Sequence, residues 1–173
     1  FAKKHDIFIL SDLAYAEVAD ALGIHSPWGQ RVVIEVPQYL LIVGALGAVY
    51  RLAARRLSGQ QPLWVVIAVV AYPPFVWFSG RTMGESISTL LLLWGLERLD
   101  ASDEPAPRAP VFGGLLLGLA EVVRYGSAAV IVPAMVWLLV TRRFKTFAWA
   151  TLAGLVVALG LGALDRVTWG DWF

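Results

Sequence analysis

The apolar run from Val111 to Val140 is the feature that most restricts the fold of this chain. It is longer than the ~20 residues that one membrane-spanning helix requires. Only Glu121 and Arg124 bring charge into it, and Arg124 is followed directly by Tyr125 and Gly126. An arginine at the centre of a bilayer costs about 2.5–3.5 kcal/mol on insertion scales. The run therefore has to be divided in a way that brings Arg124 close to water.

Further apolar runs predict the same class of protein along the rest of the chain. Hydrophobic residues make up 58% of the chain and charged residues 16%, against about 25% charged residues in an average soluble domain. Mean hydropathy is +0.68. We expect an all-α, polytopic membrane protein with short or broken transmembrane helices. The expected spans are residues 32–50, 63–78, 82–96, 111–124, 127–140 and 147–164.

Loop charges predict how these spans are arranged across the membrane. Arginine and lysine concentrate in loops 51–61 and 141–146, and short loops rich in these residues stay in the cytoplasm. Loop 97–110 must then be cytoplasmic as well, so the run 111–140 begins and ends on that side. Two short helices joined by a turn at residues 124–126 meet this condition, and one helix does not.

The same count gathers four polar stretches on the outer side of the membrane. They are residues 1–31, 79–85, 121–127 and 165–172. Residues 1–31 form a separate outer segment ahead of the bundle 32–173, with an amphipathic helix that ends near Gly23. It is interpreted as an interfacial helix or as a surface helix packed on the bundle. The chain starts at Phe1 rather than Met and is interpreted as a piece of a longer protein.

Charged and aromatic side chains in these stretches are candidates for a site. Arg124 offers planar, bidentate donors to a phosphate, although a local ion pair with Glu121 is the simpler alternative. Asp12 and Glu17 are candidates for a general base, and a solvated helix face is the alternative. Trp169 and Trp172, with the neighbouring Phe173, are interface-belt residues or, alternatively, stack on a sugar.

Cofactor and metal motifs are absent from the sequence. There is no cysteine, the two histidines His5 and His25 are isolated, and no Gly-rich phosphate loop occurs. We therefore expect no cofactor and no metal. A net charge of +1 gives no indication of nucleic-acid binding.

Three segments resemble motifs of the Alg9-like mannosyltransferase family. FSGRTMGESISTLLLLWGLERL is similar to the segment of that family that carries an Arg-Thr pair. GGLLLGLAEVVRYGSAAVIVPAMVWLL is similar to a segment with Gly-Leu, an arginine and a proline. LDRVTWGDWF is similar to a segment that begins with aspartate and ends in Gly-x-Trp after a membrane span. The weaker likeness of GQRVVIEVP extends the resemblance over about residues 26–173.

This resemblance implies a GT-C fold and an inverting sugar transfer. Family members move mannose from a polyprenyl (dolichyl) phosphate to lipid-linked glycans or glycolipid anchors on the luminal or extracytoplasmic side. By position, the matched motif residues are Arg81, Thr82, Arg124, Asp165, Gly170 and Trp172. The acidic pair of the family's first outer loop has no full match here. Asp12 stands as a reduced form of it, or the pair lies upstream of Phe1.

The expected function is therefore transfer of a hexose, mannose by resemblance, to a lipid-linked or glycan acceptor. Arg81, Thr82, Arg124, Asp165, Trp169 and Trp172 would bind the donor, with Asp12 or Glu17 as the base. We expect a multi-pass protein of the bacterial plasma membrane, or of the endoplasmic reticulum in a eukaryote, whose partners are the two substrates and membrane lipids. The alternatives are a transporter or flippase for an anionic lipid or solute, and a non-catalytic membrane subunit.

Overall fold

A computed structural model describes residues 17–73, 84–101 and 107–169, and within them the chain is helical without any strand. The helices are α2 (Pro27–Ala54), α3 (Gln61–Ala71), α5 (Gly84–Asp100), α6 (Arg108–Val123), α7 (Ala128–Val140) and α8 (Phe144–Trp169). A short 3₁₀ turn, η2 (Tyr125–Ser127), joins α6 to α7. The all-α fold class is confirmed. Among the described helices two, α2 and α8, are long and apolar enough to cross a membrane.

Proline and serine signals set the ends of the first helices. Ser26 caps α2 by accepting a hydrogen bond from the backbone amide of Gly29 at 3.1 Å, and Pro27 occupies the first turn, where its missing amide costs nothing. The helix therefore starts ahead of the predicted span 32–50. Gly23, with φ +71°, ends the preceding helical residues 17–21.

The helix α3 is shorter than the span 63–78 that the sequence predicts. It ends at Ala71, and Tyr72 is extended with ψ 114°. The residue before a proline is disfavoured in the helical conformation, and Pro73 follows Tyr72. Residues 74–78 of that span lie outside the described residues.

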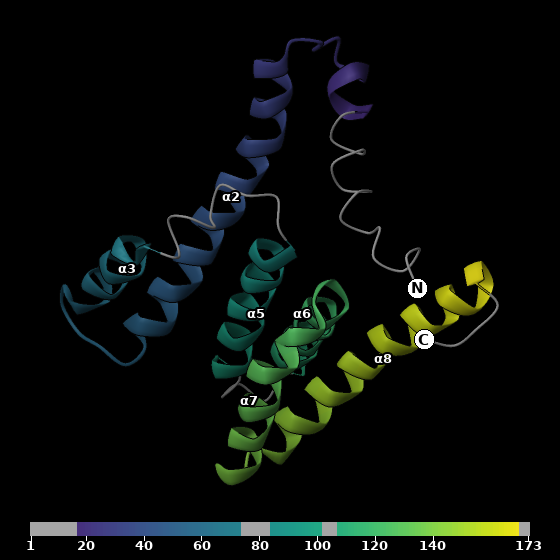
Figure 1. Cartoon of the computed structure of the whole chain (residues 1–173). Helices are drawn as coiled ribbons and strands as arrows, with labels where there is room; N and C mark the ends of the chain where they lie inside the picture. Colours follow the sequence, from purple (N-terminus) through teal and green to yellow (C-terminus); the bar gives the residue numbers. More distant parts are fainter. Residues whose placement is uncertain (1–16, 74–83, 102–106, 170–173) are drawn as a thin grey trace.

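α6 is the central helix of the bundle and packs closely on both α5 and α8 (Figure 1). The close approach depends on glycine. A Cβ at Gly114 would lie 2.2 Å from the carbonyl oxygen of Ala150, and one at Gly95 would lie 2.7 Å from the Leu117 side chain. Small residues allow helix backbones to approach in this way, as is common between membrane helices.

A small apolar core lies where α5, α6, α7 and α8 meet. Leu99, Leu117, Leu138 and Ala150 are buried there, and Phe147 packs against them. Elsewhere the helices leave large apolar side chains exposed along their length, for example Leu40, Val43, Leu155 and Leu159. Such a surface is unlike that of a soluble monomer, in which large apolar patches are rare.

Candidate functional site

The long apolar run is broken at Arg124, where the sequence places a turn. α6 ends at Val123, and Arg124 is extended with φ −152° and ψ 110°. The amide of Arg124 still donates to the carbonyl of Ala120 at 3.0 Å, and the amide of Ser127 donates to the carbonyl of Arg124 at 2.9 Å. The tight turn exposes Arg124 and Tyr125 at the end of the bundle.

Two buried serines fix this turn to the start of α5. The hydroxyl oxygens of Ser88 and Ser127 lie 2.7 Å apart, and the Ser127 hydroxyl also donates to the carbonyl of Ala120 at 3.1 Å. Because Ser88 is close to the N-terminal end of α5, this end of α5 and the α6–α7 turn lie together.

Helix directions bring a third segment to the same end. Gly95 packs against Leu117 and Leu99 packs against Gly113, so α5 and α6 are antiparallel. The close pairs of Gly114 with Ala150 and of Gly118 with Gly154 make α6 and α8 parallel. The N-terminal end of α5, the α6–α7 turn and the C-terminal end of α8 therefore share one end of the bundle.

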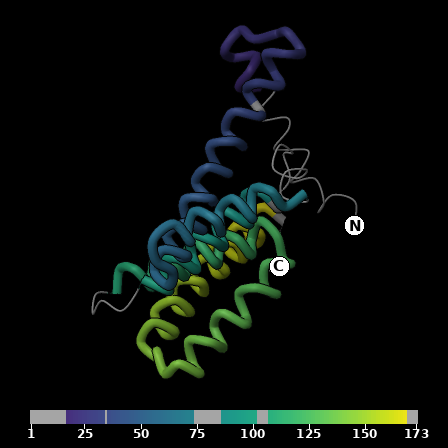
Figure 2. Tube along the Cα trace, turned by 90° about the vertical axis from the view of Figure 1, so that its left-hand side faces the viewer, coloured from purple at the N-terminus to yellow at the C-terminus, as the bar shows by residue number. Residues whose placement is uncertain are grey.

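The predicted site residues are only partly within the described chain. Arg124 is exposed at the turn, Asp165 is half-buried near the C-terminal end of α8, and Trp169 is the last residue of that helix. Glu17 is exposed on the short helix 17–21, which lies beyond the N-terminal end of α2 and apart from the α6–α7 turn in both views (Figures 1 and 2). Outside the described residues lie Asp12, Arg81, Thr82, Gly170 and Trp172.

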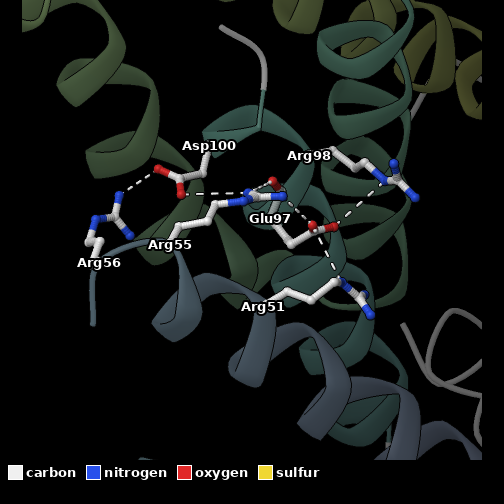
Figure 3. Close-up of polar contacts among 6 residues, drawn as sticks. All are labelled: Arg51, Arg55, Arg56, Glu97, Arg98 and Asp100. Atoms are coloured by element: carbon white, nitrogen blue, oxygen red, sulfur yellow. Dashed lines mark hydrogen bonds and ion pairs between the residues drawn. The ribbon is translucent and has the colours of Figure 1, made fainter. Parts of the chain in front are cut away.

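The opposite end of the bundle holds an ion-pair network that the sequence interpretation missed (Figure 3). Glu97 on α5 is buried. Its Oε1 lies 2.6 Å from Nη2 of Arg55 and 3.4 Å from Nε of Arg51. Its Oε2 lies 3.7 Å from Nε of Arg98. Arg55 also donates to the backbone carbonyl of Glu97 at 2.7 Å. The network ties the C-terminal end of α2 to the C-terminal end of α5.

Asp100 extends this network by one turn of α5. Its Oδ1 lies 2.5 Å from Nη2 of Arg56, and its Oδ2 lies 3.6 Å from Nη1 of Arg55. The partners are more than forty residues apart in sequence, as the Arg56–Asp100 hydrogen bond illustrates with a separation of 44. Charge alone therefore gave no signal of the pairing. Only the alignment of α2 beside α5 brings these residues together.

A cavity of about 660 Å³ lies between α6, α7 and α8. Its wall is apolar except at Glu121, Tyr125 and Thr151. Oε2 of Glu121 and the hydroxyl oxygen of Thr151 are buried and have no hydrogen-bond partner among the described residues. The backbone amide of Ala128 bonds to the Glu121 carboxylate. The local pair that the sequence suggests between Glu121 and Arg124 does not satisfy Oε2 of Glu121.

No group of three or more acidic, histidine or cysteine side chains that could hold a metal ion occurs within residues 17–73, 84–101 and 107–169. The comparisons with known proteins add no family. No protein-family model matches the chain, and neither a curated protein nor a solved structure matches it.

Proposed function

We propose that the chain belongs to a multi-pass membrane glycosyltransferase that takes a hexose from a polyprenyl-phosphate donor on the extracytoplasmic side. One observation carries the proposal. The three segments that resemble mannosyltransferase motifs adjoin the N-terminal end of α5, the α6–α7 turn and the C-terminal end of α8, and these helix ends point to the same end of the bundle. Segments far apart in sequence must converge in this way to form one site.

The distribution of charge supports a membrane orientation. All described lysine and arginine residues lie toward the end with the Glu97 network, except Arg31, Arg124 and Arg166. Cytoplasmic loops carry such an excess. The opposite end would then face outward, and the exposed apolar side chains between the two ends would contact lipid.

The proposed chemistry is an inverting transfer. The acceptor hydroxyl attacks the anomeric carbon, the bond from that carbon to the phosphate oxygen breaks, and the lipid phosphate leaves with the electron pair. Arg124, together with Arg81, would stabilise the charge that grows on this phosphate. The hydroxyl proton would pass to a carboxylate. Asp12 remains the first candidate, as the resemblance implies. The helix 17–21, which carries Glu17, lies away from the α6–α7 turn.

A transfer assay in sealed membranes tests the proposal. We expect labelled polyprenyl-phosphate mannose to give a glycosylated lipid product, and Arg124→Ala to lower kcat/KM about 100-fold, because removal of one stabilising donor typically has that effect. Arg142→Asn is the control, since Arg142 lies at the opposite end and has φ +58°, which asparagine tolerates.

Two outcomes would contradict the proposal. Equal loss of transfer in both variants would show that Arg124 has no special role. Movement of the intact lipid-linked sugar between leaflets that depends on Arg124, without transfer, would favour the transporter instead.

A further inference from the structure

The ion-pair network at the C-terminal ends of α2 and α5 holds more positive than negative charge. Its charged side chains are the carboxylates of Glu97 and Asp100 and the guanidinium groups of Arg51, Arg55, Arg56 and Arg98 (Figure 3). Two positive charges are therefore left over among the described residues of the network. Like charges that are held close together repel each other, so an anion beside them would stabilise this end of the bundle.

The distances show which arginines carry the surplus charge. Arg55 and Arg56 make the short contacts to the carboxylates, with N···O distances of 2.6 and 2.5 Å. Arg51 and Arg98 face Glu97 through Nε, at the longer distances of 3.4 and 3.7 Å. Their side chains are 50% and 51% exposed, whereas the side chain of Glu97 is 5% exposed. The two weakly paired arginines are thus accessible to a ligand.

Arg51 and Arg98 come from different helices, yet their guanidinium groups are neighbours. Both Nε atoms face the carboxylate of Glu97, and both groups lie on the side of Glu97 that is away from Arg56 (Figure 3). Neither side chain makes a hydrogen bond or another ion pair with the described residues, so the Nη atoms of both are available. A guanidinium group can bind phosphate oxygens through two parallel hydrogen bonds.

An apolar surface adjoins the two arginines. The guanidinium carbon of Arg98 lies 5.7 Å from the centre of the Phe112 ring, and Phe112 is exposed. Leu119, two turns farther along α6, is exposed as well. Nη1 of Arg51 lies 3.6 Å from the position that a Cβ would occupy at Gly47, so this side chain runs back along α2 and away from its C-terminal end. A ligand with an anionic head and an apolar chain matches this arrangement.

We propose that Arg51 and Arg98 bind the phosphate of an anionic glycerophospholipid in the cytoplasmic leaflet, with an acyl chain against Phe112. The phosphodiester supplies a negative charge and two unesterified oxygens, one for each guanidinium group. Basic pockets between membrane helices on the cytoplasmic side bind such head groups. The proposal rests on the membrane placement proposed above but not on sugar transfer, so an inactive transferase would leave it intact.

Two phospholipids with the same palmitoyl and oleoyl chains test the preference for negative charge. Phosphatidylglycerol is anionic, whereas the choline group of phosphatidylcholine cancels the charge of an otherwise identical phosphodiester. Native mass spectrometry of the purified chain in detergent, over a series of lipid concentrations, counts the bound lipid. We expect phosphatidylglycerol to bind about tenfold more tightly, because each arginine near an anionic head group contributes a several-fold preference. An excess of inorganic phosphate should not displace it, because the acyl chain contributes to binding.

Variants assign this preference to the two arginines. Arg51→Gln combined with Arg98→Gln should remove it, whereas Arg51→Lys combined with Arg98→Lys should keep most of it, because the charges remain. The matched control is Arg108→Gln combined with Arg142→Asn, which removes two positive charges from exposed positions at the same end of the bundle. This control should keep the preference. Circular dichroism and a single elution peak establish that each variant is folded.

The acidic residues Asp103 and Glu104 follow the network in sequence and lie outside the described residues. Asp103→Asn combined with Glu104→Gln should leave the affinity for phosphatidylglycerol unchanged. A large gain in affinity would show that these carboxylates are the partners of the two arginines, and the proposal would be wrong.

Three further results would overturn the proposal. Equal binding of the two phospholipids would mean that the surplus charge serves an acidic protein segment or only water. Displacement by inorganic phosphate would indicate a site for the free anion. An equal loss in the control variant would mean that lipid responds to the overall charge of this end and not to Arg51 and Arg98.

Discussion

At the scale of single residues, Glu97 is the centre of the ion-pair network. Its side chain is 5% exposed, yet it compensates charge on three arginines from two helices. A buried carboxylate is tolerated only when it is paired in this way. The arginines depend on Glu97 in turn, because their positive charges would repel each other if its carboxylate were removed.

We expect Glu97→Gln to lower the free energy of unfolding by about 3 kcal/mol, as is typical when one partner of a buried ion pair is removed. Glu35→Gln is the control, because its pair with Arg31 is exposed and should contribute less than about 1 kcal/mol. Denaturant titration of both variants in the same detergent measures the difference. A similar loss in the two variants would contradict a special role for Glu97.

At the scale of helices, the packing of α6 against α8 depends on the absence of a side chain at one position. Gly114 faces the backbone of Ala150 so closely that a Cβ would overlap it. Gly160, also in a helix, has open space around it. The two glycines thus form a natural pair for comparison.

We expect Gly114→Ala to destabilise the bundle by about 1–3 kcal/mol, because an added methyl group in a packed interface forces the helices apart. Gly160→Ala should be neutral or stabilising by up to about 1 kcal/mol, because alanine favours the helical state. Unfolding in detergent, followed by circular dichroism, measures both. If the two substitutions had the same effect, the close α6–α8 packing would be wrong.

Local signals in the sequence were enough to locate most helices and the break between α6 and α7. These local signals act on the backbone next to them in sequence: the Ser26 side chain caps α2, Pro27 favours its first turn, and Gly23 ends the preceding helix. The break at Arg124 follows from the charge of the loops on either side. The Glu97 network and the cavity could not be predicted. Both depend on which faces of distant helices meet, and one residue of rotation on a helix moves a side chain by about 100°.

At the scale of the whole molecule, the fold separates two ends of opposite character. One end carries the arginine-rich network around Glu97. The other end carries the turn at Arg124 and the C-terminal end of α8. The membrane orientation inferred from this separation stays a prediction, and the absence of cysteine from the sequence makes it directly testable.

We expect Tyr125→Cys and Thr168→Cys to react with an impermeant maleimide from outside intact cells, and Ser58→Cys and Thr141→Cys to react only after the membrane is opened. All four positions are exposed, whereas Ser127 is buried and unsuitable. Labelling in detergent is the control for reactivity. Reaction of Tyr125→Cys and Thr168→Cys from opposite sides would exclude the shared outer face.

The anchoring of α2 has a mechanical consequence. Its C-terminal half is held by the Glu97 network and by the bond from the Trp94 indole to the carbonyl of Gly44 at 3.0 Å. Its N-terminal part stands clear of the other helices labelled in Figure 1, and Trp28 there is 73% exposed. The part of α2 from Pro27 to Gly44 is about 26 Å long, at a rise of 1.5 Å per residue. A tilt of about 10° at Gly44 therefore moves the N-terminal tip of the helix by about 4 Å.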